Sequence, residues 1–220
     1  MPIVGRPPIR EDTAKRKERV GAGMIKIREI QKIEEIEQCE KLPILYKLWG
    51  TEKDICCYGQ MGYIPEKEWV VKLTACEAEP LATYVQAEDP VYKDSALEVF
   101  LNFAPETDNY LNLEVNANGA LLCQFGKKGD REPASNRCAW KASVDACRAD
   151  DKWSVLLRVP FRLIRECFGE VCLQKGMQIR FNLYKICETE GNKHFISYTF
   201  IPVPESDFHL PQYFATGIME

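Results

Sequence analysis

Residues 89–126 have the sequence DPVYKDSALEVFLNFAPETDNYLNLEVNANGALLCQFG, and apolar and polar side chains alternate in two segments of it. Alternation with a period of two is typical of antiparallel strands that bury one face. The apolar residues of the two segments are Leu97, Val99, Leu101, Phe103, Leu111, Leu113 and Val115. The stretch therefore predicts two strands of one β-sheet, with these side chains turned toward the core.

The opposite face of these two predicted strands is polar. Carboxylates and amides beside an aromatic ring suit a sugar, because hydroxyls need hydrogen-bond partners and the C–H faces of the ring need a flat apolar surface. The alternative is an outer sheet face that is only solvated. The residues on this face are Glu98, Phe100, Asn102, Asn112, Glu114 and Asn116.

The rest of the chain also favours strands. A helical stripe of apolar residues covers 161–168 and ends at Gly169, while 127–136 is rich in turn-forming residues and is predicted to be a polar loop. The segment from Ile25 continues either into a short helix or into a second strand. We predict an all-β fold, a single antiparallel β-sandwich with jelly-roll or immunoglobulin-like layers and one short helix. Further predicted strands cover 69–76, 140–144, 153–159, 177–186 and 195–203.

The chain divides into two parts by composition. Residues 1–23 hold six basic and three acidic side chains, with several Pro and Gly, and are predicted to be a disordered basic arm. Residues 24–220 are predicted to form one domain. The whole chain has a net charge of −4, which leaves −7 for the domain and argues against nucleic acid as a partner. A tether to an anionic surface is the alternative role for the arm.

The ten cysteines are scattered, without the C-x-x-C spacing of a zinc or redox site. We expect mostly reduced, buried thiols, because the chain is large enough to bury a core without disulfides. No signal peptide or membrane-spanning segment is recognisable, so a cytoplasmic location and no membrane partner are expected.

The common catalytic motifs are missing. The sequence has no G-x-G-x-x-G, P-loop, G-x-S-x-G or H-E-x-x-H. A glycosidase needs two opposed carboxylates, and Glu98 and Glu114 are a nominal pair, but both lie in the middle of predicted strands. We therefore expect a binding protein and no enzyme.

Four segments together resemble a known family. They are DPVYKDSALEVFL, YLNLEVNANGALL, RFNLYK and HFISYTFIPVPESDFHLPQYF. They resemble the family 9 carbohydrate-binding modules, which belong to a wider group of DOMON-like β-sandwiches. The resemblance covers residues 45–214, and its most specific parts are Asp94-Ser95-x-x-Glu98-x-Phe100 and Asp207-Phe208-His209-x-Pro211. It implies a sandwich that binds sugar between aromatic side chains, with no cofactor other than calcium in some members.

The resemblance also indicates site residues. The family's two stacking tryptophans are replaced in this chain, where Tyr92 and Phe208 take the matching positions. Neighbouring polar residues that could bond hydroxyls are Lys93, Glu114, Asn116 and His209. Asp94 and Ser95 could instead bond local backbone at the entrance of a strand.

Tryptophans and one lysine complete the candidates. Trp69 and Trp153 open apolar strands and are predicted to lie in the core. Trp49 and Trp140 adjoin polar sequence and could form an exposed aromatic platform. Lys185 falls on the face of its strand that should be buried, so it either marks the strand's end or belongs to a paired charge.

We expect the domain to bind a mono- or oligosaccharide without catalysis. The predicted site is Tyr92, Lys93, Glu98, Asn112, Glu114, Asn116, Trp140, Phe208 and His209. One alternative is a DOMON-like haem or redox module, for which His194, His209 or a methionine would supply axial ligands. Another is an interaction scaffold that has lost its ligand.

Overall fold

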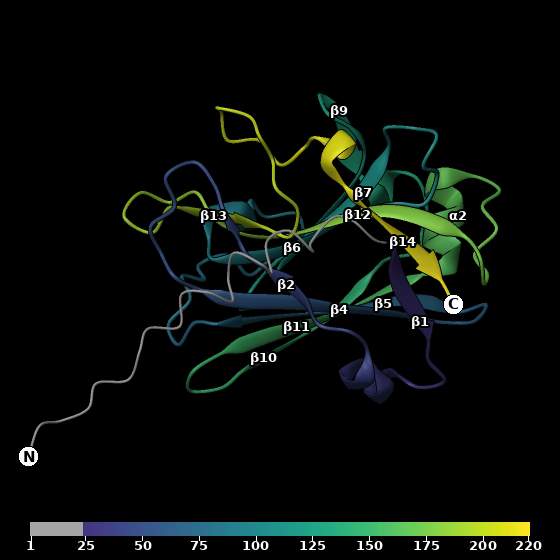
Figure 1. The fold of residues 1–220 in the computed structure, drawn as a ribbon, viewed down its shortest axis with the longest axis horizontal. Coiled ribbons are helices and arrows are strands. Elements are labelled where there is room, and N and C mark those ends of the chain that lie inside the picture. Colours follow the sequence, from purple (N-terminus) through teal and green to yellow (C-terminus); the bar gives the residue numbers. More distant parts are fainter. Residues whose placement is uncertain (1–23) are drawn as a thin grey trace, which may run out of the picture.

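Two β layers pack face to face in residues 24–220, the part of the chain that the computed structural model describes (Figure 1). The predicted arm, residues 1–23, lies outside the described residues. The upper layer in Figure 1 consists, in spatial order, of β14 (Ala215–Met219), β12 (Gln178–Cys187), β6 (Ala96–Asn102), β7 (Tyr110–Asn116), β8 (Leu121–Lys127) and β9 (Asp130–Pro133). The lower layer consists of β4 (Cys56–Ile64), β5 (Glu68–Cys76), β11 (Trp153–Pro160) and β10 (Ser143–Arg148).

Three short strands extend these layers. β2 (Leu42–Ile44) pairs with β4, and β13 (His194–Ser197) pairs both with β12 and with β3 (Tyr46–Lys47). The predicted sandwich is confirmed.

β1 (Ile25–Glu29) joins the two layers. Its first half pairs with β14 of the upper layer, Ile25 opposite Gly217, and its second half pairs with β4 of the lower layer, Arg28 opposite Gly62. Both pairings are parallel, whereas the other strand pairs of residues 24–220 are antiparallel as predicted. The prediction of a purely antiparallel sandwich is therefore corrected at this one strand.

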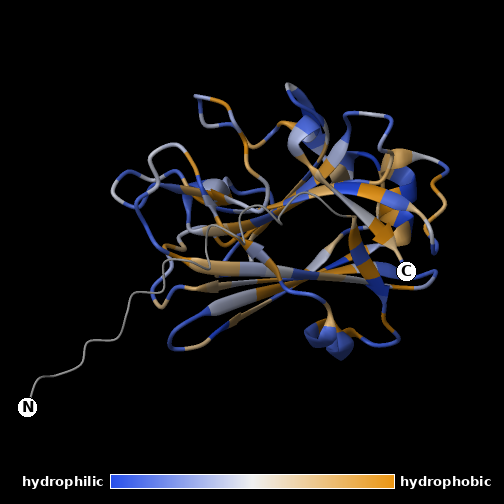
Figure 2. Ribbon diagram, viewed as in Figure 1, coloured by the Kyte–Doolittle hydropathy of each residue, from blue (hydrophilic) through white to orange (hydrophobic). Residues whose placement is uncertain are grey.

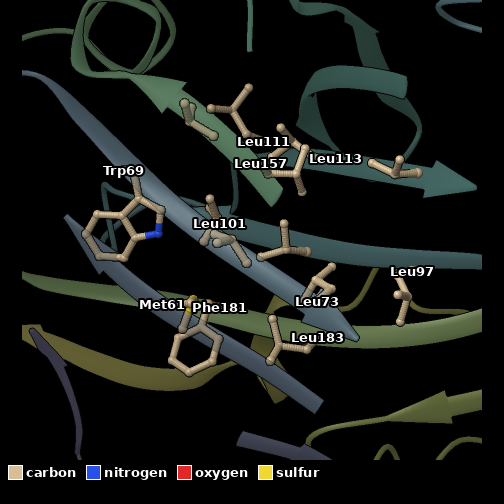
Figure 3. Packing of buried hydrophobic residues seen from close by; sticks show 14 of the residues in the cluster. Met61, Trp69, Leu73, Leu97, Leu101, Leu111, Leu113, Leu157, Phe181 and Leu183 are labelled. Carbon is tan, nitrogen blue, oxygen red and sulfur yellow. The ribbon is translucent and has the colours of Figure 1, made fainter. Parts of the chain in front are cut away.

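The core lies between the layers. Figure 3 shows side chains of both layers meeting there, with Trp69 and Leu73 of β5 above Phe181 and Leu183 of β12 in the view. Burying one side chain of this kind contributes about 1.5 to 3 kcal/mol. Apolar residues are concentrated on the strands, and the loops are mostly hydrophilic (Figure 2). The predicted core residues are all buried, namely Trp69, Leu97, Val99, Leu101, Phe103, Leu111, Leu113, Val115 and Trp153.

Helices are short. The predicted helix is confirmed as α2 (Phe161–Phe168), which ends at Gly169 with a φ of 78°. The segment after β1 is the 3-10 helix η1 (Ile33–Gln38), the first of the two predicted alternatives. Single-turn 3-10 helices also occur at η2 (Val91–Lys93), η3 (Ala134–Asn136) and η4 (Pro211–Tyr213).

Three local predictions are wrong. The predicted strand 140–144 is shifted to β10, an edge strand whose mostly exposed side chains give no apolar alternation. The predicted polar loop 127–136 contains β9, which forms a hairpin with β8. The predicted strand 195–203 ends at Ser197, because β14 pairs with Gln178–Phe181 on the same edge of β12 and the chain between β13 and β14 must leave the layer.

Lys185 belongs to a buried polar cluster inside the sandwich. Its ammonium donates to Ser95 Oγ and to His194 Nε2 at 2.8 Å and lies 3.3 Å from Glu77 Oε2. Ser95 Oγ and Trp153 Nε1 in turn donate to Glu77, at 2.7 and 3.2 Å. Lys185 is thus the paired charge of the two predicted alternatives, and the cluster connects strands of both layers. We refer to Glu77, Ser95, Trp153, Lys185 and His194 as the core cluster.

All ten cysteines lie in the described part of the chain, and none forms a disulfide there. Five of them are buried, so the expectation of mostly buried thiols holds for only half. None of the helices in residues 24–220 has the length and apolar character of a membrane span.

Candidate functional site

The polar face predicted from the alternation exists, on the outer side of the upper layer. Strand pairing aligns its residues in rows across four strands. One row runs Tyr184, Glu98, Glu114, Leu122, and the next runs Asn182, Phe100, Asn112, Gln124. The side chains of each row project from the same side of the sheet. The alternation thus correctly predicted which residues share this face.

This face is covered and not solvated as one alternative had it. The segment between β13 and η4 crosses over it beside β9 (Figure 1). Glu98 is 2% exposed, Glu114 is 4% exposed, and Asn112 is fully buried. Between the covering segments and the sheet remains a cavity of about 470 Å³, which we call the upper cavity. Its floor comes from β6, β7, β8 and β12, and its walls come from Trp49, Tyr92, Arg131, Glu188, Phe195 and residues 206–209.

Two carboxyl groups face each other on the floor of the upper cavity. Glu98 of β6 and Glu114 of β7 are directly opposite in the strand register, which brings their Cβ atoms within about 5.5 Å. Burial raises the pKa of Glu98 well above its ordinary value, and the neighbouring Glu114 and Glu188 raise it further. Burial likewise raises the pKa of Glu114 to about 7, against the opposing effect of Asn112 and Arg131. Both carboxyl groups therefore favour the protonated, neutral form, because two like charges would be poorly solvated and would repel each other here.

Two acceptor atoms on this floor are buried without a hydrogen-bond partner. Asn112 Nδ2 donates to Glu114 Oε1 at 2.7 Å, but Glu114 Oε2 and Asn112 Oδ1 have no partner within the described residues. A buried polar atom left unpaired costs about 1 to 3 kcal/mol. Both atoms can therefore gain free energy from donors that a ligand brings.

Arg131 supplies the positive charge of the upper cavity. Its guanidinium donates to Tyr110 Oη at 3.1 Å and to His209 Nδ1. Because arginine only donates, His209 Nδ1 must accept, which leaves the ring proton on Nε2. Burial and the nearby Arg131 lower the pKa of His209 to about 3, so its ring is neutral at pH 7. The His209 ring also stacks on Phe100, with centroids 5.1 Å apart.

A glycine places Arg131 at the cavity. Gly126 of β8 lies opposite Arg131 of β9 in the register, with a φ of 138° that residues with side chains rarely adopt. A Cβ at this position would lie 2.1 Å from the carbonyl oxygen of Asp130. The close approach of β9 to β8 therefore requires glycine here.

Aromatic rings form one side of the upper cavity. Phe208 stacks on Tyr184 with centroids 4.1 Å apart, and Trp49 packs against Phe208 at 5.3 Å and against Phe195 at 5.5 Å. Trp49 Nε1 donates to the carbonyl of Val203, which ties this ring to the covering segment. Rings beside carboxyl groups provide the apolar surface and the hydrogen-bond partners that sugar recognition needs.

The sequence model of carbohydrate-binding family 9 matches residues 63–219, most of the chain and all of the cavity floor. The chain belongs to carbohydrate-binding family 9. The predicted resemblance is confirmed, and so is the expectation of a binding protein, because the members of family 9 are non-catalytic binding modules. None of the curated proteins compared with the chain is significantly similar to it in sequence.

Solved structures share this fold. A candidate carbohydrate-binding protein from Bacteroides uniformis has a TM-score of 0.74 at 18% identity, and the match covers 90% of this chain and 99% of that one. Family 9 modules from Caldicellulosiruptor kristjanssonii score 0.63 in complex with cellotriose and 0.65 in complex with glucose. Their identities are 12% and 10%, and the matches cover 90% of this chain and 94% and 96% of theirs. At such identities the likeness shows the fold.

The upper cavity brings together five of the nine site residues predicted for this family 9 member. They are Tyr92, Glu98, Glu114, Phe208 and His209. Asn112 adjoins them through its bond to Glu114. Phe208 is almost fully buried, so it lies in the cavity wall and is no free stacking ring.

The other three predicted residues lie elsewhere. Asn116 is on the same sheet face, but its Nδ2 donates to Asp94 Oδ2 and to the carbonyl of Tyr84, both at 2.8 Å. Lys93 is exposed beside the cavity and does not line it. Trp140 is exposed as predicted, with Arg162 over its ring, but does not line the upper cavity.

Asp94 and Ser95 have structural partners. Asp94 accepts from the backbone N–H groups of Thr83 and Tyr84, which fits the local backbone bonding that one alternative proposed. Ser95 belongs to the core cluster.

Several cavity residues were missed as site candidates. Arg131 lies in the segment predicted to be a loop, where Lys128-Gly129 forms the two-residue connection between β8 and β9. Trp49 was considered as a platform but not placed in the site. Glu88 and Glu188 carry no local signal, because strand ends and loops bring them to the cavity.

Residues 24–220 offer few side chains that could hold a metal ion or a haem. Within residues 24–220, no group of three or more His, Cys, Asp or Glu side chains is arranged to hold a metal ion, so the carboxyl groups of the upper cavity do not fit a calcium site. Both ring nitrogens of His194 are engaged, one by Lys185 and the other by the carbonyl of Asn192, which disfavours it as a haem ligand. The absence of a cofactor, with calcium as the possibility that the family resemblance implies, stays a prediction.

Proposed function

We propose that this family 9 member binds a mono- or oligosaccharide in the upper cavity and leaves it chemically unchanged. The observation that carries the proposal is the pair of buried, unpartnered acceptors, Glu114 Oε2 and Asn112 Oδ1, on a cavity floor beside aromatic rings. Sugar hydroxyls are donors and could satisfy both atoms. Two structural relatives were solved with glucose and cellotriose, which supports a sugar as the ligand.

The cavity offers complementary groups for one sugar ring. The carboxyl groups of Glu98 and Glu114 accept from hydroxyls on one side of the ring. Tyr92, which is half-buried, and Trp49 offer apolar surface for its C–H groups. A volume of about 470 Å³ lies within the range of small-molecule sites.

The test compares an aromatic residue that lines the upper cavity with one that lies outside it. A glycan array with the intact chain identifies a sugar, and calorimetry then measures its affinity for the wild type, Tyr92→Ala and Trp140→Ala. We expect Tyr92→Ala to weaken binding about tenfold, because a ring at the cavity wall is lost. Trp140→Ala is the matched control, an aromatic residue outside the upper cavity, and should leave the affinity unchanged.

Two results would contradict the proposal. If Trp140→Ala weakens binding and Tyr92→Ala does not, the sugar binds at the Trp140 surface and not in the upper cavity. If no glycan on the array binds, the domain is the interaction scaffold considered as an alternative.

A further inference from the structure

The upper cavity is lined by more acidic than basic side chains. Among residues 24–220, five carboxyl groups line the upper cavity, and Arg131 is the one lysine or arginine that does so. Lys128 Nζ lies 2.5 Å from Asp207 Oδ2, which balances one of the five. Four carboxyl groups therefore share one guanidinium. They are Glu88, Glu98, Glu114 and Glu188.

Arg131 does not satisfy the floor of the cavity. It donates to Tyr110 and His209, and no hydrogen bond joins it to Glu98 or Glu114. Glu114 is 96% buried, and its Oε2 atom has no partner although the side chain lines the cavity. A carboxyl oxygen in this position is completed by a donor from outside the chain, and a cationic donor would also relieve the repulsion between Glu98 and Glu114.

A metal ion is a poor candidate for this cation, because the carboxyl groups are not clustered closely enough to coordinate one. An organic ammonium needs no such geometry. Its N–H groups can donate to separate carboxyl groups, and its charge is attracted to the faces of aromatic rings such as Trp49 and Tyr92.

We propose that the sugar bound in the upper cavity carries a protonated amino group, as a hexosamine does, and that this group lies between Glu98 and Glu114. The inference rests on the proposed function, because it names the class of sugar that the same cavity takes. A neutral sugar leaves two opposed carboxyl groups buried together, whereas an amino sugar supplies the missing charge. An acidic sugar adds a further negative charge and is disfavoured.

The experiment compares four sugars of similar size. Calorimetry at about pH 7 and low ionic strength measures glucosamine, glucose, N-acetylglucosamine and glucuronate, and most amines of this kind keep their proton at this pH. We expect glucosamine to bind at least about tenfold more tightly than glucose. N-acetylglucosamine, which keeps the ring but has no charge, should not show this gain.

Variants then locate the origin of the preference. Glu114→Gln should bring the affinity ratio of glucosamine to glucose close to one. Glu188→Gln changes an exposed residue that lines the cavity and should reduce this ratio in part. It replaces Glu114→Gln as the test variant if Glu114→Gln does not fold. Glu79→Gln removes an exposed carboxyl group outside the cavity and should leave the ratio unchanged.

The outcomes separate this inference from the proposed function. If wild-type protein binds glucose as tightly as glucosamine, or prefers glucuronate, the inference is wrong and the sugar-binding proposal stands. If none of these sugars and no glycan on the array binds, both fail. A preference for glucosamine that survives Glu114→Gln and Glu188→Gln would also overturn the placement of the amino group.

Discussion

The core cluster and the floor of the upper cavity are both buried and polar, but only the core cluster pairs an acidic with a basic side chain. In the core cluster, Lys185 and Glu77 compensate each other, and Ser95 completes their hydrogen bonds. On the cavity floor, Glu98 and Glu114 are two acidic groups opposite each other, and Glu114 Oε2 has no partner within residues 24–220. The two layers of one small domain thus contain a satisfied cluster inside and an unsatisfied one outside. The hydrogen bonds of the first are made within the chain, whereas the second has an acceptor left for the ligand that we propose.

The largest effect is expected from breaking the core cluster. Glu77→Gln leaves Lys185 buried without a countercharge, so the free energy of unfolding should fall by about 3 kcal/mol, as measured by urea denaturation. The double variant Glu77→Gln with Lys185→Met removes both charges and should recover part of the loss. A single variant as stable as the wild type would show that Lys185 is neutral in the folded protein.

Removing an acidic group from the cavity floor should raise the free energy of unfolding, and the gain should depend on pH. The folded pKa of Glu114, about 7, is above its ordinary value of 4.5, so folding takes up protons and wild-type stability is lost as the pH rises from 4.5 to 7. Glu114→Gln cannot lose a proton. It should match the wild type near pH 4.5 and be more stable by up to about 3 kcal/mol above pH 7.

Because two histidines also titrate, the test is the difference in stability between the wild type and Glu114→Gln at each pH. The pKa values of His194 and His209 are lowered, to about 4 and about 3, so their contribution is lost as the pH falls below 6.5 in both proteins. Thermal or urea unfolding of both proteins across this pH range removes the shared contribution. A difference that stays constant with pH would show that Glu114 does not titrate in this window.

The smallest effect is expected from a chelator. If a bound metal ion balanced Glu98 and Glu114, the two clusters would not differ, and EDTA would lower the melting temperature and the sugar affinity. We expect no change in either, because the carboxyl groups do not form a metal site. Loss of stability in EDTA that calcium restores would contradict this expectation.

Residues in regular strands were the most predictable part of the site. Alternation placed Glu98, Asn112 and Glu114 on one face because β6 and β7 keep their period for seven residues each. The same alternation could not separate Asn116 from them. Its neighbours in space are Tyr84 and Asp94, which belong to a segment without any period.

The segments that cover the site could not be predicted either, because their positions depend on contacts between residues distant in sequence. The chain between β13 and η4 leaves the layer because β14 takes its place beside β12, a competition between segments distant in sequence. Arg131 depends on the Gly126 conformation, which the sequence shows only as one glycine in a polar segment. The fold class could be predicted from local patterns alone, whereas predicting the cavity walls would require knowledge of long-range contacts.

β1 has a mechanical consequence for the domain. It lies parallel to β14, so the start of β1, at Ile25, and the end of β14, at Met219, belong to adjacent strands near the C-terminus (Figure 1). Opposite pulls on these two points act along the strands and load the hydrogen bonds between them together, in shear, instead of peeling them one by one. A domain stretched between these two points therefore resists first at the pairing of β1 with β14.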